Sequence, residues 1–258
     1  MRHVLGYGAA LCLLVLILCQ SIIFPSFFMP FFRQQFNRTY ERHVFNRPGE
    51  PPANVPLAEA IHMDFDELMH VTTELLDYMR GRRDNLYGIR AVVDGVQRGP
   101  AEEGYQEFFG PREIDHMVDV RVLYDRLYIV RNVAFFGLIG LLAAMALLKY
   151  NVLHLLARCS REIMAGFLGL GLILVGLVAL DFDRAFEIFH LILFNNDYWL
   201  LNPQHHLLIN IVPIEFFVSI AIFIGALMSG IPLLVIIVNT LYLRWEKRRT
   251  GLSFGGSS

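Results

Sequence analysis

Residues 4–24 read VLGYGAALCLLVLILCQSIIF, an apolar run without a charged side chain. The run is long enough for one membrane crossing, because the hydrocarbon core of a bilayer needs about 20 residues of helix. Residues 127–148, 163–180 and 211–243 are similarly apolar. We therefore predict a mainly α-helical integral membrane protein with four transmembrane helices.

The first run differs from a cleaved signal peptide. It lacks a small-x-small cleavage site, and it is longer than the usual signal core of about 7–15 residues. We expect a retained helix. The second run carries Arg131 near its start, where a long side chain can reach the headgroups. The fourth run exceeds the length of one crossing, which predicts a projection, a tilt or a bend at Pro213 and Pro232.

The composition supports a membrane protein. Of 258 residues, 55% are hydrophobic, against about 45–50% in ordinary soluble domains. The net charge of −2 gives no reason to expect a nucleic-acid partner. The three cysteines lie outside the segments that we place on the outer face, so disulfides are not expected.

The charges of the short loops predict the orientation of the chain in the membrane. Basic residues fill the loop after the second run and follow the fourth, whereas residues 181–210 hold one arginine against four acidic side chains. Because basic loops stay in the cytoplasm, both termini are expected to be cytoplasmic. The predicted order is 1–25, transmembrane helix 1; 26–126, a small extracytoplasmic domain; 127–148, transmembrane helix 2; 149–162, a cytoplasmic loop; 163–180, transmembrane helix 3; 181–210, a short extracytoplasmic helical loop; 211–243, transmembrane helix 4; and 244–258, a cytoplasmic tail.

The first outer segment shows local structure signals. A turn-rich linker occupies residues 48–56, and an apolar stripe over 64–79 predicts a helix closed by Gly81. Residues 86–96 alternate weakly, as in a short hairpin. Pro111 predicts the start of a helix that runs into the second span.

The second outer segment is denser in aromatic residues. Phenylalanines and His190 share one face of a predicted helix, which the residues 195–199, NNDYW, interrupt. Asn202 is expected to cap a new helix with Pro203 at its first position.

Two histidines carry the expected chemistry. His116 and Asp119 are three residues apart on one helix face, so the carboxylate can accept from an imidazole nitrogen and fix its tautomer. His190 sits in a short loop between two spans. Because imidazole titrates near neutral pH, two histidines at the outer surface of the membrane could act as a general acid–base pair.

A metal site is the competing interpretation. His62, Asp66 and His70 can share a helix face, but no HExxH motif is present. The string GLSFG at 251–255 matches a nucleophile elbow, yet no strand precedes it and no helix follows it. We expect no metal and no cofactor.

Four motifs in order resemble one family. They are LLDYMRG at 75–81, EIDHMVDV at 113–120, FHLILF at 189–194, and WLLNP at 199–203 followed by PIEFF at 213–217. The chain resembles the four-span lipoprotein intramolecular transacylase (Lit) family over about residues 1–249. Val212 departs from the aromatic residue expected before Pro213.

The resemblance implies a membrane-bound acyltransferase that acts on diacylglyceryl-modified lipoproteins of Gram-positive bacteria. Such an enzyme moves the sn-2 acyl chain to the α-amino group of the same cysteine, which gives a lyso-form lipoprotein. His116 and His190 match the family's two catalytic histidines. Asp119 is expected to orient His116, and Asn195, Trp199 and Asn202 are expected to position the substrate or the loop.

Two alternatives stay open at this point. One is a metal-dependent membrane hydrolase, and the other is a non-catalytic membrane partner or assembly protein. Transport is disfavoured because the spans hold almost no ionisable residues. The sequence assigns no role to His205, His206 or Glu215.

Overall fold

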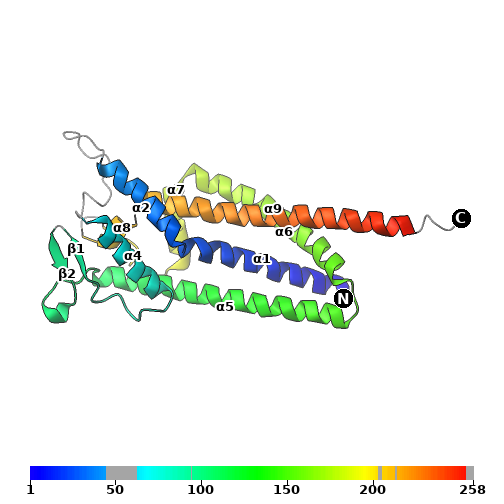
Figure 1. Ribbon diagram of the computed structural model, residues 1–258, viewed down its shortest axis with the longest axis horizontal. Coiled ribbons are helices and arrows are strands. Elements are labelled where there is room, and N and C mark those ends of the chain that lie inside the picture. Colours follow the sequence, from blue (N-terminus) through cyan, green and yellow to red (C-terminus); the bar gives the residue numbers. More distant parts are fainter. Residues whose placement is uncertain (45–62, 94, 203–204, 213, 254–258) are drawn as a thin grey trace. The chain divides into compact units, whose positions relative to one another are not determined.

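The computed structural model describes residues 1–44, 63–93, 95–202, 205–212 and 214–253 (Figure 1). Its elements are α1 (Arg2–Ser26), α2 (Met29–Val44), α4 (Phe65–Met79), β1 (Ala91–Val93), β2 (Val96–Arg98), the 3₁₀ turn η1 (Ala101–Glu103), α5 (Pro111–Leu147), α6 (Val152–Leu180), α7 (Phe182–Leu193), α8 (Leu207–Ile211) and α9 (Ile214–Ser253). The predicted linker at 48–56 lies outside the described residues.

The chain forms two compact units. The span unit comprises Met1–Phe24, Arg126–Ala185 and Ile222–Ser258, and the site unit comprises Pro25–Asp125 and Phe186–Ala221. Helices α5 and α9 each contribute residues to both units.

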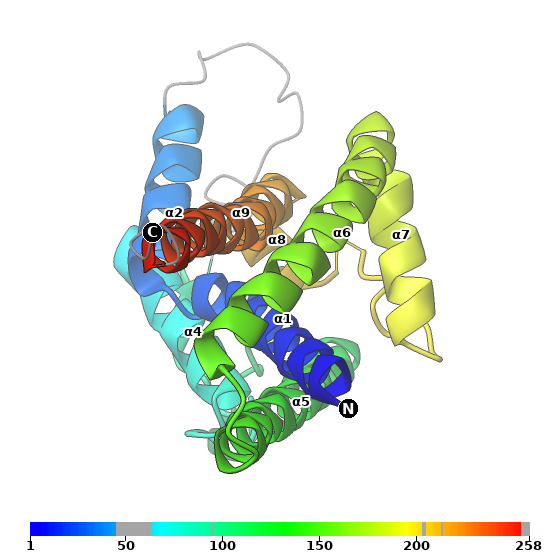
Figure 2. The same cartoon turned by 90° about the vertical axis from the view of Figure 1, so that its right-hand side faces the viewer.

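Small residues let the helices of the span unit approach closely. Helices α1 and α5 lie side by side in both views (Figures 1 and 2), with Gly8 facing Leu141 and Gly137 facing the Cys12 sulfur. A Cβ on Gly6 would come within 2.8 Å of the Cys159 sulfur on α6. Small residues at such contacts are typical of helices that pack within a membrane.

Three helices among the described residues are long and apolar enough to cross a membrane: α1, α5 and α9. Many of their exposed side chains are apolar; Val133, Phe136 and Ile222, for example, are each more than two-thirds exposed. Such a surface suits contact with lipid. The expected third span falls in the second half of α6, where no side chain from 172 to 180 is described.

The element boundaries correct two predictions. The last long helix begins at Ile214, because α8 ends at Ile211, and it continues past residue 243 to Ser253 with Pro232 inside it. Asn202 is not the helix cap: its carbonyl accepts from His205 and His206 in a turn, and His206 occupies the N-cap position of α8. Pro213 and Pro203 lie outside the described residues.

Other predictions agree with the structure. The predicted helix at 64–79 is α4, whose N-cap Asp64 accepts from the Phe65 amide, and Gly81 follows it with φ +74°. The hairpin expected at 86–96 is the antiparallel pair β1–β2, which begins only at Ala91 and ends at Arg98. Helix α5 runs unbroken from Pro111 into the second apolar run.

The core of the site unit gathers around α4. Its apolar stripe, including Val71 and Leu75, packs with Phe36 of α2, Val93 of β1 and the buried Phe108. Burial of this stripe follows from its helical spacing and gives the unit its own hydrophobic core.

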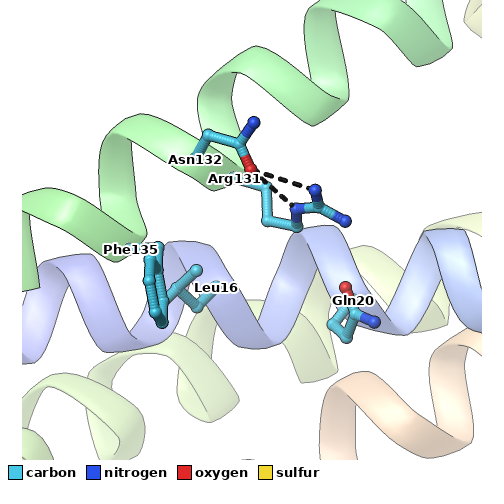
Figure 3. A pocket seen from close by; sticks show the side chains of 5 residues that line it. All are labelled: Leu16, Gln20, Arg131, Asn132 and Phe135. Atoms are coloured by element: carbon cyan, nitrogen blue, oxygen red, sulfur yellow. Dashed lines mark hydrogen bonds between the residues drawn. The ribbon is translucent and has the colours of Figure 1, made fainter.

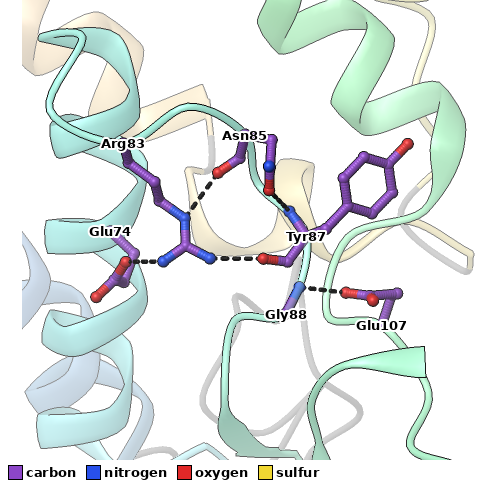
Figure 4. A network of polar contacts seen from close by, with 6 residues as sticks. All are labelled: Glu74, Arg83, Asn85, Tyr87, Gly88 and Glu107. Carbon is purple, nitrogen blue, oxygen red and sulfur yellow. Dashed lines mark hydrogen bonds and ion pairs between the residues drawn. The ribbon is translucent and has the colours of Figure 1, made fainter. Parts of the chain in front are cut away.

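A polar network holds the connection between α4 and β1 (Figure 4). The Arg83 guanidinium pairs with Glu74 and donates to the carbonyl oxygens of Asn85, at 2.7 Å, and Tyr87. The Gly88 amide donates to Glu107 at 2.7 Å. The network therefore satisfies loop carbonyl groups that no strand or helix pairs.

Candidate active site

His190 is held at the end of α7, in the site unit. Its side chain is 7% exposed, and its Nδ1–H donates to the Phe186 carbonyl oxygen at 2.7 Å. The ring stacks on the Trp199 indole, with centroids 4.8 Å apart and planes inclined by 25°. These contacts fix the ring orientation and assign the proton to Nδ1, so Nε2 carries the lone pair of the neutral imidazole.

His116 lies on the first turns of α5, facing His190. The two ring centroids are 6.1 Å apart, and the Phe194 ring lies 5.4 Å from His116 and 5.7 Å from His190. The Nδ1 atom of His116 is buried and has no hydrogen-bond partner. An orphaned buried nitrogen is costly, and such groups are characteristic of functional sites.

Both imidazoles are neutral at physiological pH. Burial, with a smaller effect of neighbouring His190, lowers the pKa of His116 to about 4, although Asp119 opposes the change. Burial also lowers the pKa of His190, against the opposing effect of its hydrogen bond to Phe186. Each ring thus offers one N–H donor and one basic nitrogen.

Asp119 does not make the expected hydrogen bond through Nδ1 of His116. Its carboxylate instead accepts from the Asn196 amide at 2.7 Å. The segment that interrupts the helix after His190 supplies this donor, and Asp119 acts on His116 through its charge.

Two further contacts connect α5 with the turn after α7. The Arg112 guanidinium forms an ion pair with Asp197 at 3.2 Å, and the Trp199 indole N–H donates to the Asn196 carbonyl oxygen at 3.0 Å. Together with the Asp119–Asn196 bond, they hold Trp199 against His190.

Glu113 joins the start of α5 to α8. The side chain is 2% exposed, and its two oxygens accept from the backbone amides of Gly110 and Leu208, both at 2.6 Å. Burial raises the pKa of Glu113. The contact with Gly110 satisfies an amide before the first helical turn, as in a capping box, one turn before His116.

The remaining predicted residues are less central. Asn195 is exposed, and the Asn202 backbone amide donates to Nδ1 of His206 at 2.9 Å. Asn196, Phe194 and Glu113 were absent from the sequence-based candidates. The Asn195-Asn196 pair that ends the helix was the only sequence signal for Asn196. The sequence does not show which of these two side-chain amides contacts Asp119.

The alternative metal site has no counterpart in the described part of the chain, where no three His, Cys, Asp or Glu residues are placed to hold an ion. His70 is exposed on α4. His62 lies outside the described residues.

The fold and site define a membrane-integral, mainly helical protein with a facing pair of neutral histidines, of which His190 is buried and His116 is half-buried. Residues 7–217 match the family model described as "Lipoprotein intramolecular transacylase Lit". The chain therefore belongs to the Lit family of membrane-integral acyltransferases, as the resemblance implied.

Solved structures share the fold. An in meso structure of the membrane-integral lipoprotein intramolecular transacylase Lit from Bacillus cereus has a TM-score of 0.71 at 17% identity, covering 96% of this chain and 98% of that one. A structure of the same protein with a histidine replaced by arginine has a TM-score of 0.63 at 17% identity, covering 97% and 95%. No curated protein matches the chain.

Proposed function

We propose that the chain moves the sn-2 acyl group of a diacylglyceryl-cysteine lipoprotein to the α-amino group of the same cysteine, giving the lyso-form lipoprotein. The observation that carries this proposal is the facing pair His116 and His190, whose rings are neutral and 6.1 Å apart. Amine and ester belong to one molecule, so the reaction needs no nucleophile from the protein. Holding them together can supply about 7–11 kcal/mol of the barrier.

His190 is the proposed general base. Its Nδ1–H is committed to Phe186, which leaves Nε2 as the basic nitrogen. The neutral amine attacks the ester carbonyl carbon, the N–C bond forms, and the amine proton passes to Nε2. A lowered pKa keeps the ring unprotonated before this step.

His116 is the proposed oxyanion donor. With a pKa of about 4 it carries no surplus proton, but its remaining N–H can donate to the tetrahedral oxyanion. When the C–O bond to the sn-2 carbon breaks, the alkoxide takes back the proton held by His190. The cycle is balanced: one amide forms, one ester breaks, and both histidines end neutral.

The proposed topology follows the charge of the short loops. Both termini lie in the cytoplasm of a bacterial cell, α6 supplies the fourth span, and the site unit lies on the extracytoplasmic face. The substrate partner is a diacylglyceryl lipoprotein within the membrane, and no nucleic acid takes part. The predicted cytoplasmic loop at 149–162 is mostly the start of α6, and α9 continues through the predicted tail to Ser253. The basic residues of both ranges support this orientation.

The test is N-terminal lipopeptide mass spectrometry of a lipoprotein processed by purified variants. We expect His190→Ala to lower the rate by about 10²–10⁴-fold, as for loss of a general base. We expect His116→Ala to lower it by about 10²–10³-fold, as for loss of an oxyanion donor. His70→Ala, at an exposed position, is the matched control.

Each alternative predicts a different result. Normal conversion by both variants would contradict the proposed chemistry and favour a binding protein. Loss of wild-type activity in a chelator, restored by added metal, would favour the hydrolase.

A further inference from the structure

A mainly apolar pocket with three polar side chains in its lining opens in the span unit between α1 and α5, in a different unit from the histidine site. Its volume is about 380 Å³, and it is lined by Leu16, Gln20, Arg131, Asn132 and Phe135 (Figure 3). Gln20 lies four residues before the end of the first apolar run, and Arg131 lies four residues after the start of the second. Both therefore lie about 6 Å inside the same end of the spans.

Arg131 has no ionic partner in this pocket. Its Nε and Nη2 donate to the neighbouring Asn132 side-chain oxygen at 3.2 and 2.9 Å, and the guanidinium lies 5.0 Å from the centroid of the Tyr128 ring. No carboxylate among the described residues pairs with it. Of its five N–H donors, three remain for another acceptor.

A cation at this depth favours an anionic ligand. An unneutralised guanidinium in a transmembrane segment is costly, so such residues characteristically mark binding sites. The planar fork of arginine matches the oxygens of a phosphate in a bidentate arrangement. The side-chain amides of Gln20 and Asn132 supply further polar groups, and Leu16 and Phe135 offer apolar walls to an acyl chain.

We propose that this pocket binds the phosphate of an anionic glycerophospholipid from the adjacent leaflet. The lining contains no carboxylate that could receive an ammonium headgroup, which favours phosphatidylglycerol over phosphatidylethanolamine. The acyl-transfer substrate proposed above carries no phosphate on its diacylglyceryl group. The phospholipid is therefore a separate ligand.

The experiment is native mass spectrometry of the purified chain, titrated with dioleoyl phosphatidylglycerol, dioleoyl phosphatidylethanolamine, dioleoylglycerol or inorganic phosphate. We expect one phosphatidylglycerol per chain, bound more tightly than the other three. Arg131→Gln should weaken this binding by about tenfold to a hundredfold, the usual effect of losing hydrogen bonds to a charged group. Arg131→Lys, which keeps the charge but loses the fork, should bind with intermediate affinity.

The matched control is Arg126→Gln. Arg126 is an exposed arginine of the same helix, outside the pocket. It should leave the affinity within about twofold. Equal loss in the two glutamine variants would overturn the proposal in favour of diffuse surface charge, and equal binding of dioleoylglycerol would overturn the role of the phosphate. Equal binding of inorganic phosphate would overturn the lipid as the ligand. If Arg131→Gln does not fold, the Arg131→Lys titration decides alone, and unchanged affinity would overturn the proposal.

Discussion

His116 and His190 face each other with ring centroids 6.1 Å apart and planes inclined by 37°, although 74 positions separate them in the sequence. At this spacing one small reacting group can lie against both rings. The pair therefore has the geometry for one proton carrier and one hydrogen-bond donor acting on the same carbonyl.

The pH–rate profile should show the substrate amine rather than the histidines. The α-amino group has an ordinary pKa of about 8, so kcat/KM should rise about tenfold per pH unit between pH 6 and 7.5. Since the pKa of His190 is lowered, its protonation should steepen the profile only below its ordinary value of 6.5. Initial rates from pH 4.5 to 9 measure this. A steepening above pH 6.5 would contradict a neutral buried base.

Stability should fall in acid because of His116. Its pKa is about 4 in the folded chain and 6.5 ordinarily, so within this window only the unfolded state binds the proton. The stabilisation is fully present above pH 6.5, is lost as the pH falls, and levels off below about 4; its size is up to about 3 kcal/mol. Apparent melting temperatures in detergent should therefore depend less on pH in His116→Gln. A His70→Gln control should follow the wild type.

Trp199 is a positioning residue for His190. Replacing it with alanine removes the stacked ring at 4.8 Å and should lower kcat by about 10–100-fold with a smaller effect on KM, as for a misplaced catalytic group. Trp199→Phe should restore most of kcat. Trp245→Ala, the other tryptophan and 55% exposed, is the control. A change confined to KM would indicate a substrate contact instead.

Asp119 and Asn196 should behave as one unit. Each single alanine variant breaks the same 2.7 Å hydrogen bond, so the double variant should lose little more activity than either one. The coupling should be about 1.5–3 kcal/mol, as for a hydrogen bond to a charged group. Rates of the four proteins in the cycle measure it. Additive losses would show that the two side chains act separately, and Asp115→Ala, exposed on the same helix, should change little.

Replacing Glu113 should lower the stability of the folded chain more than its position near a helix end suggests. Glu113→Ala leaves the amides of Gly110 and Leu208 without their acceptor, at a cost of about 1–3 kcal/mol each. Thermal unfolding in detergent should show a clear decrease. Glu102→Ala, at an exposed site in η1, should not. An unchanged melting temperature would mean that other groups or water replace the carboxylate.

The structural setting of both histidines could be predicted in part from the sequence. Periodicity placed His116 on a helix that enters a span and His190 on an aromatic helix face, because such patterns depend only on neighbouring residues. The motifs that resemble the Lit family paired the two histidines. The predicted hydrogen bond between His116 and Asp119 was wrong. Asp119 instead accepts from Asn196, which lies 77 positions later in the sequence, and no local sequence pattern predicts a contact over that separation.

The sequence by itself determined the membrane-integral class and the family, since hydrophobic run length and motif order are properties of the chain in one dimension. Of the four spans it predicted, three are long apolar helices among the described residues. Only the tertiary structure decided which side chains are in contact. Trp199 stacks on His190, the Asn196 side-chain amide donates to Asp119, and the Glu113 carboxylate accepts from the first backbone amide of α8. These contacts depend on how separate segments pack, and burial then lowers the pKa of both histidines.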